Sequence, residues 1–261
     1  MGWLGAGLVD IGAGNTVWVL VVMLLAALVQ ALGGFGFALM AVPLAALVVD
    51  LELAVVAVSV GSLVNTALLC ARTYRRVERK VAVRFNVPAL IGMPIGLWVL
   101  RTAPQNPLKV MLGVIIVVAT LALMRSAFRV PGDSMSKPAA RAAVDVIAGW
   151  LSGILSTSTG TNGPPLVLAL ASRRLSPEVF RATLAFTFTV TGSLSLAMFA
   201  VSGMVSRDAL TIAVVAVPLI LLGQGVGIRL QPKLSNRRFD RLVYVLLILS
   251  GLSVGISGLT G

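Results

Sequence analysis

The chain has 261 residues, of which 58% are hydrophobic and 11% are charged, and its formal net charge is +12. A soluble domain carries charge on roughly a quarter of its residues, so this composition, with a mean hydropathy of +1.01, excludes a soluble fold and indicates an integral membrane protein. One cysteine and no histidine exclude a disulfide framework, a cysteine-based metal site and imidazole chemistry, so we expect neither a cofactor nor a metal.

Apolar segments follow one another along the chain, separated by charged or turn-forming residues. We expect helices at about 16–32, 37–49, 53–71, 85–100, 108–124, 143–155, 165–172, 182–202, 209–228 and 239–259. The longer segments suit helices that cross a hydrocarbon core of roughly 30 Å, and the shorter ones do not. The sequence therefore predicts an all-α protein with several membrane-spanning helices.

The first two segments are separated by an interruption, LGGFGFALMAVP at residues 32–43. Unwound backbone at membrane depth is tolerated only where protein buries it or where it lines a cavity. A half-helix that begins near Ala38 would aim the positive end of its dipole inward, toward an anion. The glycines suit close helix packing equally well. The candidate binding residues at this first break, with the two aromatic rings as apolar walls or gates, are Gln30, Gly33, Gly34, Phe35, Gly36 and Phe37.

The third segment carries polar side chains along one face. They are Ser59, Ser62, Asn65 and Thr66. Asn65 is the costliest of them to leave facing lipid, so we expect it to point into the bundle and include it among the candidate binding residues. Gln224, in a later segment, is a candidate of the same kind.

Basic residues concentrate in four connecting regions, after the third, fifth, seventh and ninth segments, which hold 18 of the 21 lysines and arginines. Cytoplasmic loops carry an excess of these residues, so the pattern predicts that all four regions are cytoplasmic. Both termini then lie outside the cytoplasm. We expect a multi-pass protein of the inner (plasma) membrane, with the lipid bilayer rather than a nucleic acid as the partner of its positive charge.

A second interruption, STSTGTNGPP at residues 156–165, separates the sixth and seventh segments. Hydroxyl groups, an amide and glycines are followed by two prolines, which suit the first turn of a helix near residue 165. Such donors at a helix N-terminus make an oxyanion site. The alternative is a polar cytoplasmic turn between two ordinary helices. The candidate binding residues at this second break are Ser156, Thr157, Ser158, Thr159, Gly160, Thr161, Asn162 and Gly163.

The segment 182–202 carries a hydroxyl at every fourth position, in a stripe formed by Thr183, Thr187, Thr191 and Ser195. This stripe either lines a permeation path or joins neighbouring helices, and the sequence leaves both alternatives open. Thr187 and Thr191 complete the candidate binding residues.

No acidic or basic residue lies deep in a predicted span, and Asp145 comes closest. Because buried ionisable groups mark proton relays, a carboxylate-based proton antiporter is disfavoured. An arginine in the pocket would require Arg72, Arg101 or Arg181 to reach inward, whereas each is expected to extend toward water.

The two halves of the chain read as an inverted-topology repeat, each with a re-entrant, broken helical hairpin and three membrane-spanning helices. Gly223 and Gly227 follow Gly92 and Gly96 by 131 residues each. We expect one polytopic domain over residues 1–261, with repeats at 16–124 and 143–259 joined by a cytoplasmic linker at 125–142.

The glycine cluster of the first break, followed by Pro43, and the glycine–proline break after the midpoint resemble the TauE/SafE family, the sulfite exporter or toluenesulfonate uptake permease family. The resemblance covers nearly the whole chain. It implies transport of small sulfur oxyanions such as sulfite, sulfoacetate or another sulfonate.

The sequence thus predicts a secondary transporter, expected to export a small sulfur-containing anion held between the two breaks and moved by alternating access. An anion channel or facilitator lined by the same hydroxyls is the alternative. An intramembrane enzyme is disfavoured, because histidine is absent and no buried acid or metal cluster is expected. A homodimer is compatible with the sequence.

Overall fold

The computed structural model describes residues 12–128, 138–173, 175–234 and 237–260. Within these ranges the regular structure is entirely helical. The elements are α2 (Ala13–Gly33), α3 (Phe37–Ala45), α4 (Leu51–Thr73), the short 3-10 helix η1 (Tyr74–Arg76), α5 (Arg79–Thr102), α6 (Gln105–Phe128), α7 (Pro138–Ser158), α8 (Gly163–Ala171), α9 (Pro177–Val201), α10 (Arg207–Leu234) and α11 (Arg237–Thr260). The all-α prediction is confirmed.

Each predicted apolar segment coincides with one helix, and the differences lie at the ends. α5, α7 and α9 begin several residues before their apolar segments, because apolar character marks the hydrocarbon core rather than the end of the helix. α3 ends at Ala45, before the predicted end at residue 49, since the chain turns there and the N–H groups of Val48 and Val49 both donate to Ala45 O.

Seven of the described helices are long and apolar enough to cross a membrane, namely α2, α4, α5, α6, α9, α10 and α11. α3 and α8 have nine residues each, about 14 Å of helix, and cannot span a core of roughly 30 Å. The chain is therefore a multi-pass membrane protein. The two termini and residues 129–137 of the predicted linker lie outside the described residues, so the sides of the membrane assigned to them stay predictions.

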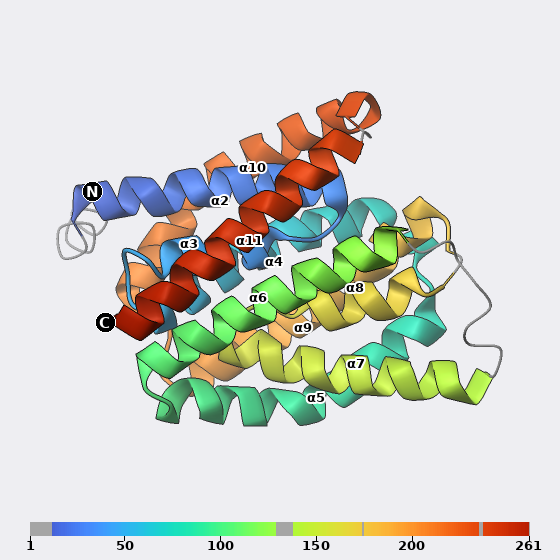
Figure 1. Cartoon of the computed structure of the whole chain (residues 1–261), viewed down its shortest axis with the longest axis horizontal. Coiled ribbons are helices and arrows are strands. Elements are labelled where there is room, and N and C mark those ends of the chain that lie inside the picture. The colour runs from blue at the N-terminus through green and yellow to red at the C-terminus, as the bar shows by residue number, and fades with distance from the viewer. Residues whose placement is uncertain (1–11, 129–137, 174, 235–236, 261) are drawn as a thin grey trace.

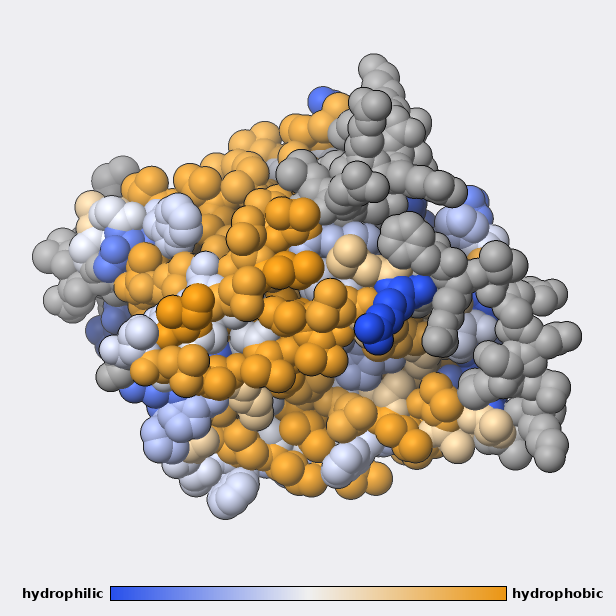
Figure 2. Space-filling model, in the orientation of Figure 1, coloured by the Kyte–Doolittle hydropathy of each residue, from blue (hydrophilic) through white to orange (hydrophobic). Residues whose placement is uncertain are grey.

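The helices alternate in direction, so their C-terminal ends lie at two opposite ends of the bundle (Figure 1). α4, α6, α8 and α10 end on one side, where the basic connecting regions begin, and α5, α9 and α11 end on the other side, where α2 begins. The surface between these ends is hydrophobic over most of the face seen in Figure 2. Exposed apolar side chains include Trp98, Ile91 and Leu222, as expected of a surface that faces lipid.

The most extensive helix contacts join the two halves of the chain. α5 packs on α7, α10 on α2, α4 on α9 and α6 on α11. In the predicted repeat each helix of the first half corresponds to the helix five places later. Under this correspondence the pair α5–α7 becomes the pair α10–α2, and α4–α9 and α6–α11 each join two corresponding helices. This is the pairing that the predicted inverted repeat would give, and the repeat itself stays a prediction.

Glycines let two of these pairs approach closely. A Cβ on Gly92 of α5 would lie 2.2 Å from Trp150 O of α7, and a Cβ on Gly223 of α10 would lie 2.4 Å from Leu24 O of α2. Both distances are too short for any side chain, so glycine is required where the backbones meet. The matched glycines therefore pack corresponding helices of opposite halves.

Candidate functional site

The first break is a short turn between α2 and α3. Gly34 ends α2 with φ of 83°, a left-handed conformation that glycine adopts without a Cβ clash, and its N–H donates to Gln30 O at 2.7 Å. Gly36, with φ of 107°, precedes α3, and Met40 N–H donates to Gly36 O at 3.1 Å. The chain thus stops one helix and starts another within the membrane-spanning part of the sequence.

The second break shares part of this backbone geometry, although Asn162, which precedes α8, has φ of −73° where Gly36 has φ of 107°. Gly160 has φ of 68° and follows α7, and Thr161 N–H donates to Leu155 O at 3.2 Å. α8 then begins at Gly163, with Asn162 as its N-cap. In both breaks a left-handed glycine stands three residues before the next helix, and the second break follows the first by 126 residues.

A small cavity lies where the two helix starts face each other. It is lined by Gln30, Gly36, Phe37, Ala38, Leu39, Ser62, Thr161, Asn162, Gly163 and Phe188. A Cβ on Gly163 would lie 3.9 Å from Leu39 Cδ1 and 3.8 Å from Phe188 Cζ, so the start of α8 contacts both α3 and α9. The open space in the cavity is about 20 Å³, and one water needs roughly 10–15 Å³. An anion of four or five heavy atoms therefore binds here only when the two helix starts move apart.

The start of α3 offers backbone donors to this cavity. Phe37, Ala38 and Leu39 form the first turn, whose N–H groups have no acceptor within the helix, and all three residues line the cavity. The positive end of the helix dipole points the same way. This end of the cavity is therefore suited to an anion without any charged side chain.

The start of α8 offers side chains instead. Pro164 and Pro165 directly follow Gly163 and carry no N–H group, so two of the donors that α3 has are missing here. The Thr161 hydroxyl and the Asn162 amide line the cavity at this point. Donors thus reach the cavity from both breaks, but from different chemical groups.

Gln30 brings an amide to the cavity from the last turn of α2. It is 3% exposed, and its Oε1 accepts a hydrogen bond of 2.8 Å from Asn65 Nδ2. Asn65 is itself held by Gln224, whose Nε2 donates to Asn65 O at 2.8 Å. Because Asn65 engages the oxygen of Gln30, the Gln30 NH₂ group is left for the cavity.

Hydrogen bonds also fix the polar groups of the second break. Asn162 Nδ2 donates to Thr191 Oγ1 at 2.8 Å, and Thr191 Oγ1 donates to Thr187 O at 2.9 Å. The hydroxyl oxygens of Thr159 and Thr161 lie 2.8 Å apart. Thr159 Oγ1 also lies 3.2 Å from Leu155 O and can donate to it. A hydroxyl has one hydrogen, so Thr161 can donate into the cavity only when Thr159 donates to Thr161 instead of to Leu155 O.

The three other hydroxyls predicted for the second break turn away from the cavity. They stand in the last turn of α7, where a hydroxyl meets neighbouring helices or its own backbone. Ser156 Oγ lies 2.8 Å from Ser195 Oγ, Thr157 Oγ1 donates to Met93 O at 2.6 Å, and Ser158 Oγ donates to Ile154 O at 2.7 Å. These hydroxyls join α7 to α9 and α5, and Ser158 bonds within α7.

The remaining residues of the first break lie beside the cavity. Gly33 is exposed, and Phe35 packs against both buried hydrophobic clusters of the bundle. Gly34 is covered by Arg181 of α9, since a Cβ on Gly34 would lie 2.8 Å from Arg181 Cγ. Arg181 Nη2 donates to Leu32 O at 3.4 Å, near the end of α2.

Arg181 therefore departs from the expectation that the arginines extend toward water. Arg72 and Arg101 are exposed, as expected, whereas Arg181 is partly buried against the first break. The free carbonyl groups at the end of α2 give its guanidinium an acceptor inside the bundle. Its position near the start of α9 carries no sequence signal for this contact.

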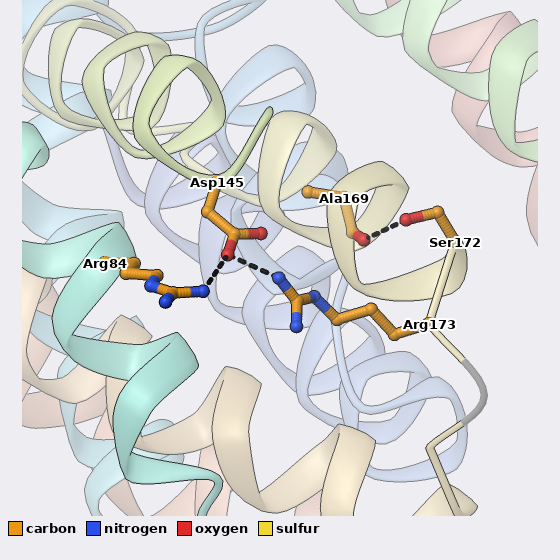
Figure 3. Close-up of polar contacts among 5 residues, drawn as sticks. All are labelled: Arg84, Asp145, Ala169, Ser172 and Arg173. Carbon is orange, nitrogen blue, oxygen red and sulfur yellow. Dashed lines mark hydrogen bonds and ion pairs between the residues drawn. The ribbon is translucent and has the colours of Figure 1, made fainter. Parts of the chain in front are cut away.

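A buried ion pair lies at the base of the second hairpin (Figure 3). Asp145 of α7 is 1% exposed, and Arg173 Nη2, just after α8, donates to Asp145 Oδ2. Arg84 Nη1 of α5 lies 3.9 Å from the same oxygen. The pair ties the two helices of the hairpin together. Among the described residues no group of three or more Cys, Asp or Glu side chains could hold a metal ion.

The first hairpin is closed at its base by uncharged groups. Trp18 Nε1 donates to Leu44 O at 2.8 Å, and Asn15 Nδ2 donates to Val48 O at 3.2 Å. Both bonds run from the first turns of α2 to the chain at the end of α3. Both hairpins are thus closed by side-chain contacts at their bases, the first by neutral hydrogen bonds and the second by an ion pair.

Sequence reasoning missed part of the lining. Ala38 and Leu39 belong to the first turn of α3, whose free N–H groups could have indicated them. Ser62 was recognised only as a neighbour of Asn65 on one face of α4. Phe188 stands next to Thr187 on α9, and nothing in the sequence indicates that its ring meets the start of α8.

Comparison with known proteins identifies relatives of this chain. Residues 19–254 match the model of a family described as sulfite exporter TauE/SafE. A curated protein of Cupriavidus necator, described as a probable sulfite/organosulfonate exporter TauE, is 25% identical over 203 residues, which cover 76% of this chain and 76% of the relative. No solved structure matches the chain.

Proposed function

We propose that this chain, which belongs to the sulfite exporter TauE/SafE family, is a secondary transporter that exports a small sulfur oxyanion, and that the anion binds in the cavity between the two breaks. Sulfite and small organosulfonates are the substrates that the relative's description suggests. The proposed contacts are the N–H groups at the start of α3 and the side chains of Gln30, Thr161 and Asn162.

One observation carries this proposal: a single cavity is lined by residues of both breaks. Two helix N-termini and several neutral donors converge there, and no carboxylate belongs to the lining. Such an arrangement favours an anion over a cation. Asn65, Thr159 and Thr191 support the site by holding the lining side chains in place.

Alternating access would follow from rocking of the two halves about the site. The pairing of α4 with α9 and of α6 with α11 joins equivalent helices of opposite halves, which supports a two-fold relation between them. An inside-negative membrane potential drives an anion outward, with about 2.3 kcal/mol per charge per 100 mV. A uniporter of this kind would therefore export.

The test is counterflow of labelled sulfite in proteoliposomes that contain the full chain. We expect wild-type protein to show saturable flux and counterflow. At sulfite concentrations below the wild-type KM, the flux through Thr161→Val should be about two- to tenfold lower, the value of one hydrogen bond. Thr120→Val is the matched control, because Thr120 is a buried threonine of α6 that bonds to Ile116 O and stands outside the cavity. Flux without saturation or counterflow would indicate an anion channel, and equal flux in both variants would contradict the proposed site.

A further inference from the structure

The cavity between the two breaks is polar but carries no charge of its own. Its hydrogen-bonding side chains are the amides of Gln30 and Asn162 and the hydroxyls of Ser62 and Thr161, and none of the ten lining residues is ionisable. We propose that the site binds oxyanions with one negative charge, namely hydrogensulfite and organosulfonates without a second acidic group, and rejects dianions such as the doubly charged sulfite ion and sulfoacetate. This inference rests on the proposed function and names the charge state of its substrate.

The first argument is the cost of removing an ion from water. This cost rises with the square of the charge, so a dianion costs about four times as much as a monoanion of the same size. Neutral amides and hydroxyls recover part of it through hydrogen bonds. Each helix N-terminus acts as about half an elementary positive charge. The starts of α3 and α8 together therefore offset at most about one negative charge, since Pro164 and Pro165 remove two N–H groups from α8. A second charge has no counterpart in the lining.

The second argument concerns the charged side chains around the site. On the five helices that line the cavity, the titratable side chains are Glu52, Cys70, Arg72, Glu178 and Arg181. Arg181 alone of these reaches the first break, where it donates to Leu32 O, and the negative charge of Glu178 acts on it from one turn earlier. Asp145 on the adjoining helix α7 is paired with Arg173. No excess of positive charge is therefore directed at the cavity.

The third argument is the shape of the substrate. Phe37, Leu39 and Phe188 also contribute apolar side chains, an apolar wall, to the cavity lining. Hydrogensulfite and sulfonates carry three oxygens around sulfur, with a lone pair, a hydrogen or a carbon on the remaining side. That side suits the apolar wall, whereas the fourth oxygen of sulfate would lose its hydration there without gaining a donor. Small sulfonates thus fit the site better than sulfate.

The test compares two substrates of the full-length protein in proteoliposomes. Methanesulfonate is a monoanion at every pH used, and sulfite changes from monoanion to dianion near neutral pH. We expect the KM for total sulfite to rise about tenfold for each pH unit above that transition, as hydrogensulfite disappears, while the KM for methanesulfonate stays constant. The inference is overturned, and the transport function left intact, if the KM for total sulfite divided by the KM for methanesulfonate stays constant or falls as the pH rises. Absence of flux for both anions contradicts the proposed function, and the inference falls with it.

A pair of variants at Gln30 separates charge from hydrogen bonding. Gln30→Met removes the donor without adding charge, so the KM for both anions should rise while the pH dependence of their ratio is kept. Gln30→Lys adds a positive charge, so the rise of the sulfite KM with pH should flatten. A folded lysine variant with the wild-type pH profile would contradict the charge argument. The wild-type profile decides the question even where a variant fails to fold.

Discussion

The two breaks both place a left-handed glycine three residues before the next helix, and they differ in where their donors come from. At the first, Gly34 and Gly36 leave bare backbone, and the start of α3 presents three N–H groups. At the second, Pro164 and Pro165 remove two N–H groups, and Thr161 and Asn162 supply side-chain donors. A pocket for an anion requires donors at suitable positions, not a particular residue type. Two breaks can therefore contribute donors to one cavity through different residues.

The largest expected loss of stability lies at the base of the second hairpin, which is closed by an ion pair where the first hairpin has uncharged groups. Asp145→Asn removes one partner of a buried ion pair and leaves Arg173 without its carboxylate, so we expect a loss of about 3–5 kcal/mol in the free energy of unfolding. Denaturation in mixed detergent micelles measures it. The double variant Asp145→Leu with Arg173→Met should recover most of the loss, since it leaves no buried charge. A single variant as stable as the wild type would show that the pair contributes nothing to closing this hairpin.

Alanine at the two left-handed glycines tests whether the breaks are equally constrained. Gly34→Ala and Gly160→Ala each force a Cβ into a left-handed conformation, at about 1–2 kcal/mol. Gly34→Ala should cost more, because its Cβ would lie 2.8 Å from Arg181 Cγ, whereas the nearest atom to that of Gly160 is Val42 Cγ2 at 3.3 Å.

The same denaturation experiment compares these two variants with Gly225→Ala, a control on α10 whose Cβ would meet nothing within 4 Å. The control should be neutral or stabilising. Equal stabilities of all three variants would contradict the backbone geometry assigned to the breaks.

Pro164→Ala should make the second break more like the first. The change restores a backbone N–H at the start of α8, and one added hydrogen bond of about 0.5–1.5 kcal/mol corresponds to roughly two- to tenfold tighter anion binding. Calorimetric titration with methanesulfonate measures the affinity. Weaker or unchanged binding in a folded variant would mean that the first turn of α8 does not contact the anion.

The smallest expected effect lies at the base of the first hairpin. Trp18→Phe keeps the aromatic ring and removes the hydrogen bond to Leu44 O, so we expect a loss of about 0.5–1 kcal/mol because the bond is exposed. Detergent denaturation alongside Asp145→Asn gives the comparison directly. A loss as large as that of Asp145→Asn would show that the two closures do not differ as their chemistry predicts.

Much of the fold followed from the sequence, because apolar length and breaks at glycine and proline are local signals. The helix starts at Phe37 and Gly163 lie close to the predicted positions near Ala38 and residue 165. The spacing that would relate the two predicted repeats differs along the chain. It is 126 residues at the breaks and 131 at Gly92 and Gly223, so no single alignment without gaps joins both regions.

The site was less predictable, because spacing indicates the face of a helix and not what that face meets. Ser156 and Thr161 looked equivalent in sequence, yet Ser156 lies within α7 and meets Ser195, whereas Thr161 follows Gly160 and lines the cavity. The hydroxyls of the stripe on α9 also differ in what they contact. Thr191 holds Asn162, while Thr187 Oγ1 is buried without a partner among the described residues.

The central claim is that donors from both breaks bind one anion. Calorimetric titration of the purified protein with methanesulfonate tests it most directly, with Gln30→Met for the first break, Thr161→Val for the second and Thr120→Val as the control. We predict that each site variant weakens binding by about two- to tenfold, the value of one hydrogen bond, and that the control binds like the wild type. Wild-type affinity in either folded site variant would contradict a site shared between the two breaks.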